Sequence, residues 1–133
     1  MIGLDTNVVL RLLLTDDLAQ KIRAAKLIHQ AKQSGTRVMV MLTVMLEVEW
    51  VLRSSAKMNK AQILNIFNLL LESHDIEIEN EKILEHALNL YDNAAADFAE
   101  CLFLAQYQRM GCNTMLTFDA KAARMAGVEL VAG

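Results

Sequence analysis

The chain has 133 residues, of which 54% are hydrophobic and 22% are charged, and its formal net charge at pH 7 is −3. This length and composition predict one folded domain, residues 1–133, and exclude an intrinsically disordered chain. The slightly negative charge excludes a generally basic surface, so any nucleic acid would have to bind at a specific site.

The predicted location is the cytoplasm. No apolar run approaches the ~20 residues needed to cross a bilayer, and Asp5 lies where a signal peptide would be apolar. Membrane association is therefore not expected. Cys101 and Cys112 have no metal-ligand spacing, which suits a reducing compartment, and both are expected to be small core residues.

Strand-like and helix-like segments alternate along the chain. The predicted strands, in chain order, are residues 1–4, 37–41, 75–79, 114–118 and 128–131. The predicted helices are residues 7–14, 18–35, 43–55 (with Thr43 as N-cap), 59–72, 80–93, 97–111 and 119–127. This alternation predicts an α/β sandwich with a mostly parallel sheet.

Acidic residues follow the predicted strands. Asp5 ends the first strand, Asp119 ends the fourth, and Glu47 lies one turn into the helix after the second. Asp97 and Glu100 begin the helix that leads into the fourth strand. Because ligands bind at the carboxyl ends of parallel strands, these carboxylates are expected at one edge of the sheet.

A purely structural interpretation competes with this one. Aspartate is a favoured N-cap, and Asp97 and Glu100 have the spacing of a capping box. Asp5 is harder to explain as a cap, because Thr6 or Asn7 could cap the same helix without adding a charge.

Glu49 is an alternative to Glu47 as the candidate acid of the predicted helix 43–55. The two glutamates flank opposite edges of one apolar helical stripe, so helical periodicity does not choose between them. Glu47 is nearer the start of the helix, which favours it.

Several converging carboxylates would raise each other's pKa unless a cation joined them. An all-oxygen ligand set suits Mg²⁺ or Mn²⁺, and the lack of nearby His or Cys argues against zinc. His29, His74 and His86 are expected to be structural or surface residues. A divalent ion at such an edge favours phosphodiester hydrolysis.

Four stretches in this order carry a family resemblance: "GLDTNVVLRLL", "LEVEWVLRS", "ADFAECLFLAQYQRMGCNTMLTFD" and "KAARMAGVELV". Together they resemble PIN-domain proteins, specifically VapC-type toxins, over nearly the whole chain. The resemblance implies a PIN-like three-layer sandwich with a central mostly parallel sheet flanked by helices. It also implies a metal-dependent endoribonuclease that acts on RNA, forms a homodimer and is neutralised by a small antitoxin protein.

The resemblance assigns roles to individual residues. Asp5 of "DTN", Glu47 before "WVL" and Asp119 of "TFD" match the family's acids, which favours Glu47 over Glu49. Thr117 is the expected orienting hydroxyl beside Asp119. The remaining two residues of "DTN" are expected to support the turn around Asp5; they are Thr6 and Asn7.

The third acid departs from the family pattern. Relatives commonly read "DFADAL" where this chain reads "DFAECL", which makes Glu100 the expected metal-facing residue and Asp97 its support. The alternative function is therefore a PIN-like binding or regulatory module with a degenerate metal site. A haloacid-dehalogenase-type phosphatase is disfavoured, because Asn7 stands where that family needs a second Asp.

The sequence predicts the residues that contact RNA or a partner protein less specifically than it predicts the acids. The candidate RNA-binding cations are Arg11, Arg53 and Lys121, with Lys57 and Arg124 as further candidates. A mean hydropathy of +0.25 and eight methionines predict an apolar face that a second copy or an antitoxin helix covers.

Overall fold

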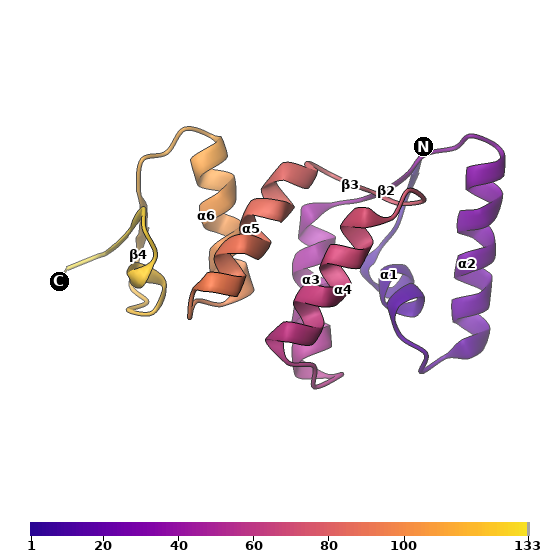
Figure 1. Ribbon diagram of the computed structural model, residues 1–133, viewed down its shortest axis with the longest axis horizontal. Helices are drawn as coiled ribbons and strands as arrows, with labels where there is room; N and C mark the ends of the chain where they lie inside the picture. Colours follow the sequence, from indigo (N-terminus) through magenta and orange to yellow (C-terminus); the bar gives the residue numbers. More distant parts are fainter. Residues whose placement is uncertain (133) are drawn as a thin grey trace. The chain divides into compact units, whose positions relative to one another are not determined.

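The computed structural model describes residues 1–132, which divide into two compact units, residues 1–79 and residues 80–132 (Figure 1). The first unit contains strands β1 (Ile2–Gly3), β2 (Val38–Val40) and β3 (Glu77–Ile78) and helices α1 (Thr6–Leu13), α2 (Leu18–Gln33), α3 (Leu42–Ser54) and α4 (Lys60–Glu72). The second contains α5 (Glu81–Asn93), α6 (Phe98–Arg109), β4 (Met115–Thr117), the short 3-10 helix η1 (Ala122–Arg124) and β5 (Val128–Leu130).

In the first unit, β2 lies between β1 and β3, and both pairings are parallel. Ile2 pairs with Val38, and Met39 pairs with Glu77. Helix α1 packs against α2 and α3, and α3 packs against α4. The parallel pairing places the carboxyl ends of β1 and β2 at the same edge of this sheet.

Helix α3 begins two residues earlier than it would if Thr43 were its N-cap. Met41 is the N-cap, it makes no side-chain capping bond, and Thr43 is exposed in the first turn. The backbone N–H of Leu42 instead donates to Oε1 of Glu79 at 2.9 Å. A carboxylate just past β3 thus satisfies the free N–H group, so the prediction of Thr43 as N-cap is wrong.

In the second unit, α5 and α6 form a helical hairpin, and η1 connects the parallel strands β4 and β5. The rings of Tyr91 and Phe98 meet edge to face across the hairpin, with centroids 5.6 Å apart. Gly127 adopts a φ of +86°, and a Cβ there would approach Nε2 of Gln108 to 2.9 Å. A side chain at this turn would therefore both strain the backbone and displace Gln108.

The two cysteines differ in their surroundings. Cys101 is buried, with its Sγ 3.9 Å from Sδ of Met125, as a core residue should be. Cys112 is exposed, so its predicted core position is wrong. It follows Gly111, whose φ of +95° ends the α6 segment and leads the chain to the surface.

Every predicted strand and helix overlaps an observed element, and the α/β class with parallel strand pairing is confirmed. The strands are shorter than predicted: "RVMVM" contributes only Val38–Val40. The last helix is also shorter, because "DAKAARMAG" forms a single 3-10 turn. Within residues 1–132, no helix is long and apolar enough to span a bilayer.

Candidate active site

Asp5 leaves β1 and is itself the N-cap of α1. Its Oδ1 accepts the backbone N–H of Val8 at 3.0 Å, and the carboxylate is exposed. Asp5 itself therefore caps α1, and neither Thr6 nor Asn7 does so. One carboxylate oxygen is fixed by the helix start, which orients the other. Asn7 and Arg11 line the same cavity of about 300 Å³ as Asp5.

Glu47 and Glu49 lie in opposite environments on α3. Glu49 is only 2% exposed, and its Oε2 accepts Nε–H of Arg53 at 3.0 Å. Glu47 is exposed. A buried carboxylate already paired with an arginine is poorly placed to bind a metal ion, so the structure supports Glu47 as the candidate.

Asp97 occupies the N-cap position of α6, but its side chain makes no capping bond. Glu100 lies in the first turn and is half-buried. The capping box that their spacing allows is absent from the described residues, so that alternative interpretation is wrong. The Asp97 side chain therefore does not act as a hydrogen-bonding cap of α6.

Asp119 follows β4 in a tight turn. Its Oδ1 accepts the backbone N–H groups of Lys121 at 2.7 Å and Ala122 at 3.3 Å. Oγ1 of Thr117 in turn accepts the backbone N–H of Asp119 at 3.0 Å. Thr117 thus orients the backbone of Asp119, and the turn orients its carboxylate.

The candidate acids are divided between the two units. Asp5 and Glu47 belong to the first, and the other three to the second; these are Asp97, Glu100 and Asp119. Within neither unit do three His, Cys, Asp or Glu side chains of the described residues form a group that could hold a metal ion.

The candidate RNA-binding cations have different partners. Nε of Arg11 donates to Oε1 of Gln20 at 2.5 Å, and its Nη1 lies 3.3 Å from Oδ2 of Asp16. Arg53 binds the buried Glu49. Lys121 forms no ion pair within its own unit. His29, His74 and His86 are all exposed, as a surface role predicts.

Exposed ion pairs occur away from these acids. Arg37 binds Glu77 through two hydrogen bonds, with Nε to Oε2 at 2.7 Å, and this pairing lowers the pKa of Glu77. Nζ of Lys32 lies 2.8 Å from Oδ1 of Asp75 and lowers the pKa of that carboxyl group. Both pairs are solvent-exposed and contribute little to stability.

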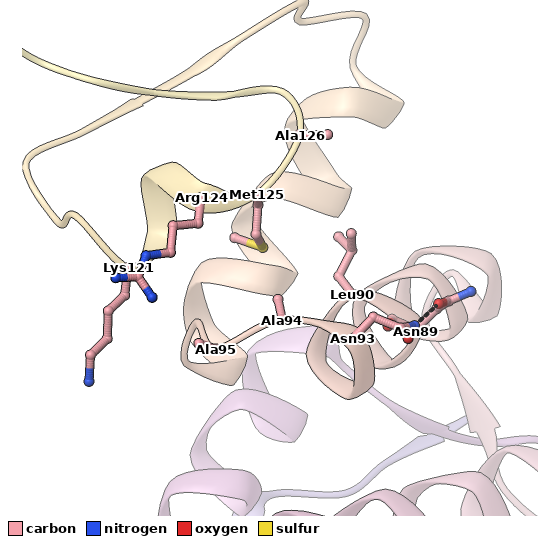
Figure 2. Close-up of a pocket in the computed structure, with 9 residues that line it drawn as sticks. All are labelled: Asn89, Leu90, Asn93, Ala94, Ala95, Lys121, Arg124, Met125 and Ala126. Carbon is pink, nitrogen blue, oxygen red and sulfur yellow. Dashed lines mark hydrogen bonds between the residues drawn. The ribbon is translucent and has the colours of Figure 1, made fainter.

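Sequence reasoning missed one feature of the second unit. A cavity of about 340 Å³ lies between the end of α5 and η1 (Figure 2). Its lining includes Asn89 and Asn93, whose side chains are hydrogen-bonded to each other, and the cations Lys121 and Arg124. The sequence signal for this cavity was a pair of asparagines four residues apart in the last turns of a helix. The same spacing also occurs on ordinary polar helix surfaces, so it does not identify a cavity.

A family model for the PIN domain matches residues 2–128. The match spans nearly the whole sequence, and the chain belongs to the PIN domain family. The chain is also similar to a VapC ribonuclease of Aquifex aeolicus (strain VF5), at 21% identity over 123 residues that cover 92% of this chain and 90% of that protein. The resemblance carried by the four sequence motifs is thereby confirmed.

Proposed function

We propose that this chain is a metal-dependent endoribonuclease that hydrolyses RNA phosphodiester bonds and acts as the toxin of a toxin–antitoxin pair. Its membership of the PIN domain family and its similarity to a VapC ribonuclease support this function. The observation that carries the proposal is the position of Asp5 and Asp119. Each follows a parallel strand, and each is exposed with one oxygen fixed by backbone N–H groups.

The donor set fits a hard divalent cation. Asp5, Glu47, Asp119 and either Glu100 or Asp97 would hold Mg²⁺ or Mn²⁺ through carboxylate oxygens. The bound ion would activate water and neutralise charge on the phosphoryl oxygens. The half-buried Glu100 is one methylene longer than the aspartate common in relatives, and it lies in the first turn of α6.

The protein side chains supply the rest of the chemistry. Asp97 and Glu100 are not engaged in capping, so one of them is available to accept the proton of the attacking water. Attack of water at phosphorus breaks the bond to the 3′-oxygen, which takes up a proton from solvent, and this leaves a 5′-phosphate and a 3′-hydroxyl. Thr117 acts by positioning, because it holds the backbone that carries Asp119.

The proposed partners are an antitoxin protein and a second copy of this chain, and the proposed location is the cytoplasm. Exposed apolar side chains support the need for a covering partner. In the first unit they lie on α2, α3 and α4 and include Leu18, Ile22, Leu27, Trp50 and Leu69. An amphipathic antitoxin helix would bury such a surface.

The function is tested by incubating the purified chain with single-stranded RNA in Mg²⁺, in Mn²⁺ and in EDTA. Cleavage is expected only with the metal ions, and the products should carry 5′-phosphates. Cleavage that persists in EDTA, or products ending in a 2′,3′-cyclic phosphate, would contradict the mechanism. RNA binding with no cleavage in either metal would favour the alternative, a PIN-like binding module with a degenerate site.

A further inference from the structure

Two cations lie at the cavity shown in Figure 2. Lys121 immediately precedes η1 and Arg124 is its last residue, and side chains three residues apart eclipse one another in a 3-10 turn. Among the described residues of their own unit, neither is paired with a carboxylate. Because two adjacent like charges repel, an anion bound between them would be stabilised by both.

Two amides line the same cavity from α5. Nδ2 of Asn93 donates to the backbone oxygen of Asn89 at 2.8 Å and to its Oδ1 at 2.7 Å, which uses both hydrogens of that amide group. Oδ1 of Asn93 and Nδ2 of Asn89 are left as an acceptor and a donor. The edges of nucleobases present the complementary pattern. The bond between the two asparagines also fixes their side chains before a ligand arrives, which lowers the entropic cost of binding.

We infer that this cavity is a nucleotide subsite of the RNA substrate. Lys121 and Arg124 hold a backbone phosphate, and the asparagine pair contacts the edge of the adjoining base. Leu90 and Met125 supply apolar surface for the base within the same lining. The volume of about 340 Å³ lies within the range of roughly 300–1,000 Å³ that is typical of small-ligand pockets.

The cavity is lined by residues that lie close in the sequence to the candidate acids of the same unit. Ala94 and Ala95 line it, and they immediately precede the segment that carries Asp97. On the other side, the backbone N–H of Lys121 is bound by Asp119. The subsite rests on the proposed nuclease function, because its ligand would be a nucleotide of the RNA substrate.

The test measures binding of a fluorescently labelled single-stranded RNA by anisotropy in EDTA, where no metal-dependent cleavage occurs. Arg124→Ala is expected to weaken binding roughly tenfold and to lower the slope of log K against log salt concentration by about one. Asn93→Ala is expected to weaken binding without changing that slope, since it removes no charge. Lys82→Ala is the matched control, because Lys82 is an exposed cation of α5 outside the cavity lining.

The outcomes separate this inference from the proposed function. If the unmodified chain cleaves RNA with Mg²⁺ while Arg124→Ala binds RNA as tightly as Lys82→Ala does, the subsite is wrong and the function stands. If no cleavage occurs but Arg124→Ala and Asn93→Ala weaken binding as expected, the function fails and the subsite stands. Absence of any RNA binding by the unmodified chain would overturn the subsite.

Discussion

Asp5→Asn is expected to slow RNA cleavage by at least about 100-fold and to change the free energy of unfolding by no more than about 0.5 kcal/mol. Asparagine caps helices as well as aspartate does, so the bond to the N–H of Val8 should survive. What the substitution removes is the negative charge that a divalent cation requires. Cleavage rates with Mg²⁺ and urea denaturation curves measure the two effects.

Asp17→Asn is the matched control for this substitution. Asp17 caps α2 as Asp5 caps α1, and its Oδ1 accepts the N–H of Gln20 at the same distance, 3.0 Å. Cleavage by Asp17→Asn should equal that of the unmodified chain. Undiminished cleavage by Asp5→Asn, or an equal loss in both variants, would show that Asp5 serves only as a cap.

The two glutamates of α3 should respond oppositely to the same substitution. Glu47→Gln is expected to slow cleavage by at least about 100-fold, with little change in stability because its side chain is exposed. Glu49→Gln is expected to lower the free energy of unfolding by about 1–2 kcal/mol, because it replaces the buried carboxylate bound to Arg53 by an uncharged amide that binds it more weakly.

Each glutamate variant is the control for the other, since both changes are isosteric and lie two residues apart. Chemical denaturation gives the stability, and cleavage per folded molecule gives the activity. A stable but inactive Glu49→Gln together with an active Glu47→Gln would reverse the assignment.

The sequence was informative about the elements because their signals are local. Apolar periodicity located α2 (Leu18–Gln33) and α6 (Phe98–Arg109), and Gly111 marked where the latter segment stops. The start of α3 could not be predicted in the same way. The carboxylate that caps it belongs to Glu79, which lies 37 residues from Leu42 in the sequence and reaches it only after β3 pairs with β2.

The sequence singled out candidate acids one at a time, and their grouping stays a prediction. Position after a strand singled out Asp5 and Asp119, and the structure shows each held by backbone N–H groups. The choice of Glu47 over Glu49 needed the family resemblance, because helical periodicity places both on edges of one stripe. Burial of Glu49 against Arg53 supplies the physical reason for that choice, and such burial depends on tertiary packing.

The structural and proposed chemical roles of Asp5 support one another. A carboxylate already fixed by a helix N-terminus loses less side-chain entropy when it binds a cation. The turn around Asp119 has the same effect through the N–H groups of Lys121 and Ala122. The account therefore depends on acids from distant parts of the chain sharing a single ion.

Calorimetric titration with Mn²⁺ in the absence of RNA tests this dependence most directly. The unmodified chain should bind Mn²⁺, and Asp5→Asn and Asp119→Asn should each weaken that binding by at least about tenfold. Asp17→Asn should not. Mn²⁺ binding that is unchanged in both Asp5→Asn and Asp119→Asn would contradict the account.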